Sequence, residues 1–156
     1  RAATGASAVW LSAKVMPLTS EGHGAFLNQS MRVARLVHHY LSKGPQQIRL
    51  LPIGDTNVVC FAVAEELDTV QQANERTESL LSFIKSSPEL SVTRIHLGLE
   101  NYGSLVNAAV QQWNGAVDDD QLTVVRMVIM NPYLDDQRVV EHIVTTLLPS
   151  IEEGLC

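Results

Sequence analysis

The sequence is poor in several features, and each scarcity excludes a class of protein. Two cysteines, Cys60 and Cys156, are too few for a disulfide framework, which favours a reducing cytoplasm. No apolar run approaches about 20 residues, so we predict no transmembrane span, and no secretory signal peptide is visible. Acidic residues (17) outnumber Lys and Arg (11), the net charge is -6 and no basic cluster occurs. We therefore predict no nucleic-acid partner and no anionic membrane surface as a partner.

Signatures of common catalytic sites are scarce as well. Glycines are too scattered for a phosphate-binding loop, and the acidic run 118–120 favours a solvated turn over a cation site. The histidines lack metal-ligand spacing with a third partner, so surface or half-buried histidines are the favoured interpretation. These histidines are His23, His38, His39, His96 and His142. We predict no metal site and no catalytic residue within this chain.

The residues that are present indicate one folded domain. The chain has 156 residues, 46% hydrophobic and 18% charged, which suits a globular core. Apolar residues at helical spacing predict helices over 3–16, 25–42 and 68–86, and a further helix after Pro132. Asp68 is the expected N-cap of the third helix. Apolar, β-branched runs predict strands over 48–51, 57–64, 91–97 and 123–132. Residues 98–121 carry the weakest pattern, and we expect a helix within them that an acidic loop ends.

This order of elements predicts an α+β fold. We expect a two-layer sandwich with about four mainly antiparallel strands and helices packed on one face of the sheet. Residues 1–42 are expected to form connecting helices, and residues 46–156 the sheet-and-helix body. The chain begins with Arg1 and enters an apolar helix directly, so we expect it to be a piece of a longer protein.

Arg126 is the residue that departs most from its surroundings. It lies in the apolar run TVVRMVIMNP, over 123–132, which predicts a buried strand. A charge inside such a strand is costly unless it has a partner. One interpretation is structural, an arginine that pairs within the fold or extends to water at a sheet edge. The other is an anion clamp, because a guanidinium binds a carboxylate through two parallel hydrogen bonds. The residues alone favour the structural interpretation over the anion clamp.

Several motifs, in this order and spacing, resemble a known family. The most specific is Arg126-Met127-Val128-Ile129 followed by Asn131-Pro132. The others are the strand over 56–61, the stretch Asn74-Glu75-Arg76, the helix over 24–41, and Val9-Trp10-Leu11 close behind Arg1. Over nearly its whole length the chain resembles the C-terminal small domain of group II pyridoxal-phosphate-dependent amino-acid decarboxylases, the group that includes glutamate decarboxylase.

This resemblance implies a fold-type I enzyme in which a large domain holds pyridoxal 5'-phosphate. The small domain then closes over the active site, and its N-terminal helix joins it to the large domain. The arginine that matches Arg126 binds a substrate carboxylate in glutamate decarboxylases, so the resemblance favours the clamp interpretation. It also implies a homodimer whose substrate is glutamate, aspartate or a related amino acid.

The resemblance implies equally what this chain lacks. The lysine that binds the cofactor lies upstream in the family and follows a histidine. The only lysines here, Lys14, Lys43 and Lys85, follow no histidine. Without a Schiff base the cofactor cannot act as an electron sink. We therefore predict that the chain is inactive alone and does not hold the cofactor covalently.

Two departures from the family pattern keep other interpretations open. The segment 98–121 is longer than the family usually has before the arginine strand, and Thr4-Gly5-Ala6-Ser7 replaces bulkier residues. One alternative is the small domain of another pyridoxal-phosphate-dependent lyase or an aminotransferase. A second is a non-catalytic interaction module of the same fold, whose apolar first helix would be an aggregation liability or an oligomer interface.

Overall fold

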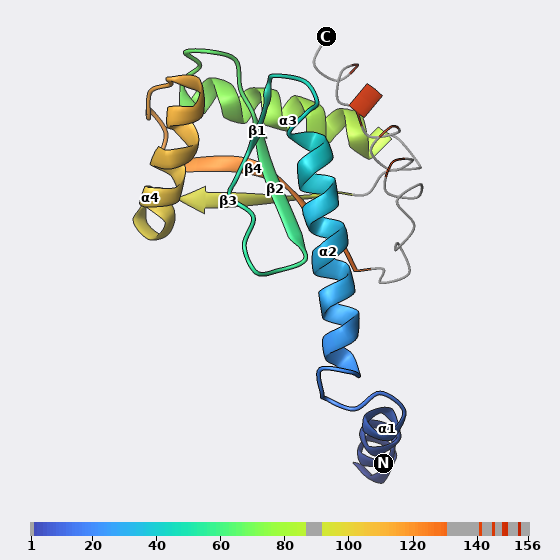
Figure 1. The fold of residues 1–156 in the computed structure, drawn as a ribbon. Helices are drawn as coiled ribbons and strands as arrows, with labels where there is room; N and C mark the ends of the chain where they lie inside the picture. Colours follow the sequence, from blue (N-terminus) through green and yellow to red (C-terminus); the bar gives the residue numbers. More distant parts are fainter. Residues whose placement is uncertain are drawn as a thin grey trace.

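A computed structural model of the chain describes residues 2–86 and 92–130 and, beyond them, positions 141, 145, 148, 149 and 153. The element order begins with two helices, α1 (Ala2–Val15) and α2 (His23–Leu41), and two strands, β1 (Ile48–Leu50) and β2 (Val58–Val63). It continues with α3 (Val70–Ser86), β3 (Thr93–Gly98), α4 (Leu99–Val110), the 3-10 turn η1 (Gln111–Trp113) and β4 (Gln121–Val128), as Figure 1 shows.

The four strands form one sheet in the order β1-β2-β4-β3, and each neighbouring pair is antiparallel. β2 and β4 consist largely of valine and other residues that favour a pleated, half-buried surface. They take the two central places, and β1 and β3 form the edges. The strand that carries Arg126 is therefore held by a partner strand on each side.

Each face of the sheet carries its own apolar cluster, because successive strand residues point to opposite faces. On one face, Phe61 and Val125 pack with buried residues of α2 and of the second half of α3. On the other, Ala62 and Val124 pack with Val106, Trp113 and other residues of α4 and η1. The core is thus two layers of side chains with the sheet between them.

The predicted fold class is confirmed, an α+β domain with a four-stranded antiparallel sheet. The distribution of the helices differs from the expected single covered face, because α4 contributes the second cluster. This helix lies within 98–121, the segment with the weakest pattern. Its helical geometry is interrupted at Tyr102, where φ is -126° and ψ is 18°, so a regular apolar stripe begins only after that kink.

The start of α3 differs slightly from the prediction. Asp68 was the expected N-cap, but Thr69 takes that role. The Gln72 amide donates to the Thr69 hydroxyl at 3.3 Å, and the Thr69 amide donates to the Gln72 side-chain oxygen at 2.9 Å. This reciprocal pair is a capping box. The Asp68 carboxylate is consequently available for other contacts.

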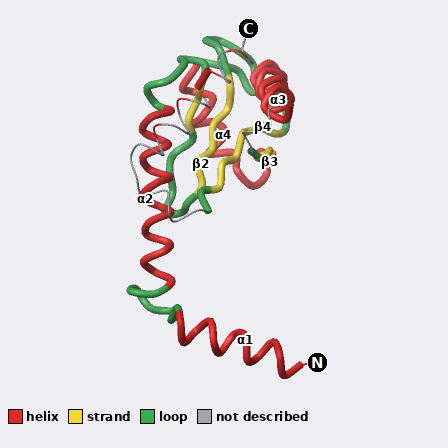
Figure 2. The backbone as a smooth tube through the Cα atoms, turned by 90° about the vertical axis from the view of Figure 1, so that its right-hand side faces the viewer, coloured by secondary structure: helices red, strands yellow, loops and turns green. Residues whose placement is uncertain are grey.

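The first helix lies apart from the sheet body, at the far end of α2 (Figures 1 and 2). Its apolar side chains have little cover: Val9 is 70% exposed, Trp10 63% and Leu11 58%. The helices predicted over 3–16 and 25–42 are present as α1 and α2, and α2 lies between α1 and the sheet in the chain. None of the described helices is long and apolar enough to cross a membrane. The expected helix after Pro132 and the Asn131-Pro132 motif lie outside the described residues.

Candidate functional site

Arg126 lies on β4, on the face of the sheet that α4 covers in part. Its Cα is directly opposite that of Cys60 on β2 and that of Thr93 on β3. Residues directly opposite one another on antiparallel strands present their side chains on the same face. The three residues therefore form one row across the sheet. This row lies beyond the part of the face where Leu122 and Val124 pack with α4.

The row is only partly covered. Arg126 and Cys60 are half-buried, and Thr93 is exposed. Within residues 2–86 and 92–130, no hydrogen bond or ion pair involves the Arg126 guanidinium, whereas Arg49, Arg76 and Arg94 each pair with a carboxylate. Burial raises the pKa of the Cys60 thiol, and the positive charge of Arg126 offsets part of that rise. The arrangement presents a cation on an accessible part of the sheet.

Asn74 of α3 holds the beginning of β4 in place. Its side-chain amide nitrogen donates to the Asp119 carboxylate at 3.0 Å and to the Gln121 carbonyl at 2.9 Å. Its side-chain oxygen accepts from the Thr123 amide at 2.7 Å. Three hydrogen bonds from one side chain thus fix where the strand enters the sheet.

The side chains of Asn57 and Thr93 form hydrogen bonds with the second half of β4 and the residue that follows it. The Asn57 side-chain amide donates to the Ile129 carbonyl at 2.7 Å, and the Ile129 amide donates to the Asn57 carbonyl at 2.9 Å. The Thr93 hydroxyl donates to the carbonyl of Arg126 itself at 3.1 Å. β4 is therefore anchored before, at and after its arginine.

The Asn74-Glu75-Arg76 motif has a structural explanation. Arg76 donates from Nε to the Asp68 carboxylate at 2.8 Å and pairs with Glu65 at 3.0 Å. The Asp68 carboxylate also accepts from the Glu65 amide at 2.7 Å. Asn74 and Arg76 therefore bind α3 to β4 and to the turn after β2, respectively. Two of the motifs that carry the family resemblance, at Asn57 and at Asn74 to Arg76, act on the scaffold of Arg126.

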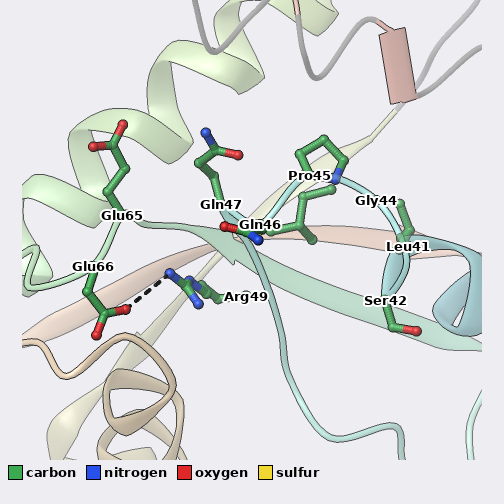
Figure 3. A pocket seen from close by; sticks show the side chains of 10 residues that line it. Leu41, Ser42, Gly44, Pro45, Gln46, Gln47, Arg49, Glu65 and Glu66 are labelled. Carbon is green, nitrogen blue, oxygen red and sulfur yellow. Dashed lines mark ion pairs between the residues drawn. The ribbon is translucent and has the colours of Figure 1, made fainter.

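A separate pocket of about 470 Å³ lies between the end of α2 and the turn after β2 (Figure 3). Its lining includes Ser42, Gln47, Arg49, Glu65 and Glu66. Arg49 is already engaged, because Nε donates to the Ala64 carbonyl at 3.0 Å and Nη2 lies 3.9 Å from Glu66. Arg126 does not line this pocket.

The chain offers no enclosed lysine for a cofactor. Lys14, Lys43 and Lys85 are all exposed, and Lys14 lies over the ring of Trp10 at 5.7 Å. A covalently bound pyridoxal phosphate needs a sheltered lysine, so the residues present do not fit that group. Within the described part of the chain, no three His, Cys, Asp or Glu residues gather at metal-binding distance. His38 lies against the Leu51 carbonyl and His96 against Thr123, which are structural contacts.

Comparison with known proteins supports a relationship to amino-acid decarboxylases. The L-tyrosine decarboxylase of Enterococcus faecium is 24% identical in an alignment 177 positions long, which covers 99% of this chain and 28% of that enzyme. The L-tyrosine decarboxylase of Enterococcus faecalis is 22% identical over 176 residues, with the same coverage of each chain. The chain thus spans about 28% of the length of these curated relatives. No family model matches the chain.

The sequence pattern points to Arg126, but it indicates neither the neighbours of Arg126 in the row nor the contacts that Asn57 and Asn74 make. Thr93 carries no signal, because an exposed threonine at the start of a weakly alternating strand is ordinary. Cys60 appeared only as part of an apolar run. The roles of Asn57 and Asn74 depend on pairing between residues 49 to 72 positions apart in sequence. Only the tertiary fold, through the strand order and the packing of α3 beside β4, brings these residues around β4.

Proposed function

We propose that this chain is the small C-terminal domain of a pyridoxal-phosphate-dependent amino-acid decarboxylase, and that Arg126 binds a carboxylate of the substrate. Similarity over 99% of the chain to two enzymes named as decarboxylases supports the class. The role proposed for Arg126 is supported by one observation. Its guanidinium lies on a partly open face of the sheet and has no carboxylate partner among the described residues. A guanidinium holds a carboxylate through two hydrogen bonds and so fixes its orientation.

The cofactor belongs to the large domain of the parent protein in this proposal. When bound, pyridoxal phosphate supplies an electron sink for the bond that loses carbon dioxide. This chain contributes binding and orientation through Arg126 and closure of the active site. We further propose a cytoplasmic homodimer, and we expect the isolated 156-residue chain to be inactive.

Two substrate classes follow from different observations. Arg126 favours an acidic amino acid, glutamate or aspartate, because a second carboxylate gives the guanidinium a partner that stays on the substrate. The names of the two relatives favour tyrosine as the second candidate. With tyrosine, the only carboxylate within reach of Arg126 is the one that leaves.

The test uses the full-length parent protein with pyridoxal phosphate. Carbon dioxide release is measured from glutamate, aspartate and tyrosine for the wild type and for Arg126→Gln. We expect Arg126→Gln to raise KM about 10- to 100-fold, the effect of losing charge-assisted hydrogen bonds. Absorbance of the bound cofactor should stay unchanged.

Arg94→Gln is the matched control. Arg94 is a strand arginine on β3 whose side chain pairs with Glu78 of α3 at 2.7 Å, on the opposite face of the sheet. It should leave KM unchanged. Equal KM values for wild type and Arg126→Gln would leave Arg126 a structural residue. The absence of carbon dioxide release from every substrate would favour an aminotransferase, another lyase or a non-catalytic module.

A further inference from the structure

The pairing of β3 with β4 ends at the arginine. Thr93 is the first residue of β3, and its partner is Arg126. Beyond this pair, β4 continues to Val128 with β2 as its partner, and the described residues place no strand on its other side. Among the described residues, β3 therefore supports the backbone of β4 as far as Arg126.

The Thr93 side chain supplies a bond at this position. Its hydroxyl donates to the Arg126 carbonyl at 3.1 Å. Thr93 is exposed, so water would satisfy its hydroxyl equally well and burial does not force it to find a protein partner. The stability gained from such an exposed bond is small. Its geometric effect is specific, because the acceptor is the peptide group of the arginine itself.

We propose that Thr93 is a positioning residue for Arg126. Its hydroxyl fixes the backbone of β4 at the end of the β3–β4 ladder, and its side chain flanks the guanidinium on the face where a carboxylate would bind. Cys60 occupies the corresponding place on the other side of Arg126. This proposal rests on the proposed function of Arg126 and adds a second residue that tunes substrate affinity.

The test compares Thr93→Val and Thr93→Ser in the full-length parent protein with pyridoxal phosphate. Valine keeps the shape of threonine and removes the hydroxyl, whereas serine keeps the hydroxyl. We expect Thr93→Val to raise KM about fivefold, the effect of one neutral hydrogen bond, and to change kcat less than about twofold. Thr93→Ser should retain the wild-type KM. A KM that rises equally in both variants, or in neither, would overturn the proposal.

Thr123→Val is the control for the loss of a threonine hydroxyl from the same sheet. Thr123 lies on β4, three residues before Arg126, and its hydroxyl contacts His96 at 3.1 Å on the opposite face. This variant should leave KM unchanged even where it lowers stability. A rise in KM equal to that of Thr93→Val would mean that any weakening of the sheet produces the effect, and the proposal would fall.

A double-mutant cycle separates this proposal from the proposed function. If Thr93 acts through Arg126, Thr93→Val should change KM no further in an Arg126→Gln background. If Arg126→Gln alone leaves KM unchanged, the proposed function fails first. If Arg126→Gln raises KM and Thr93→Val adds an independent fivefold effect in that background, only the role of Thr93 fails.

Discussion

The two tryptophans of the chain lie in opposite surroundings. Trp10, on α1, is 63% exposed, whereas Trp113, in η1, is fully buried. The Trp113 indole donates to the Asp68 carbonyl at 2.9 Å, and the Leu67 amide donates to the Trp113 carbonyl at 2.8 Å. Trp10 instead has the exposed Lys14 over its ring. Similar residue types thus serve as core in one region and as uncovered surface in the other.

The difference shows that apolar composition does not by itself determine burial. The first helix has apolar side chains on several sides and nothing among the described residues to pack them against, whereas the body pairs each apolar stripe with a sheet face. Trp113 also satisfies its polar N–H, as a buried tryptophan requires. The body should therefore respond strongly to substitution, and α1 weakly.

The largest effect should come from Trp113→Ala. It removes the largest fully buried side chain and leaves the Asp68 carbonyl without its donor. We expect the free energy of unfolding of the 156-residue chain to fall by about 3–5 kcal/mol, measured by urea denaturation followed by circular dichroism. Trp113→Phe, which keeps an aromatic ring, should lose less. A loss below about 1 kcal/mol for Trp113→Ala would contradict the buried position.

A smaller effect should come from Asn74→Ala. The substitution removes one hydrogen bond to Asp119, in the loop before β4, and two to Gln121 and Thr123 of the strand. The amide of the buried Thr123 loses its side-chain acceptor. We expect a loss of about 1–3 kcal/mol in the same assay. The control is Asn107→Ala on α4, an exposed asparagine with no hydrogen bond from its side chain within the described residues. Equal losses for the two variants would show that Asn74 does not anchor β4.

The smallest effect should come from Trp10→Ala. Trp10 lies on the exposed helix, so its removal should change the free energy of unfolding by less than about 0.5 kcal/mol. It also leaves Trp113 as the single tryptophan, whose fluorescence then reports on the body alone. A large loss of stability would mean that α1 packs against the body in solution and would remove the contrast between the two regions.

Much of the fold follows from the sequence pattern because it depends on local periodicity. The β-branched runs placed β2 and β4, and the apolar stripes placed α2 and α3 to within a few residues. α4 was less well defined, because Gly103 and the kink at Tyr102 interrupt its periodicity. The N-cap of α3 was misplaced by one residue, since Asp68 and Thr69 are both good caps and only the capping box with Gln72 distinguishes them.

In the candidate site too, the sequence indicates one residue, and the others become apparent only in the folded structure. A lone charge in an apolar strand made Arg126 conspicuous, because such a charge is rare unless it has a function or a partner. Nothing local in the sequence could assign Thr93 or Cys60 to its row, since that assignment requires the strand order and the register. The same holds for Asn57 and Asn74, whose side chains bond to residues more than 45 positions away.

The sequence by itself determined that this chain is an α+β domain with one unusual arginine. Helical and strand periodicities, and a charge within an apolar run, are local features of the sequence. Only the tertiary structure decided that β4 lies between β2 and β3 and that the Thr93 hydroxyl meets the peptide of Arg126. It also decided that Trp113 is covered while Trp10 is not. These outcomes depend on long-range pairing, in which a one-residue change of register would move every side chain to the other face.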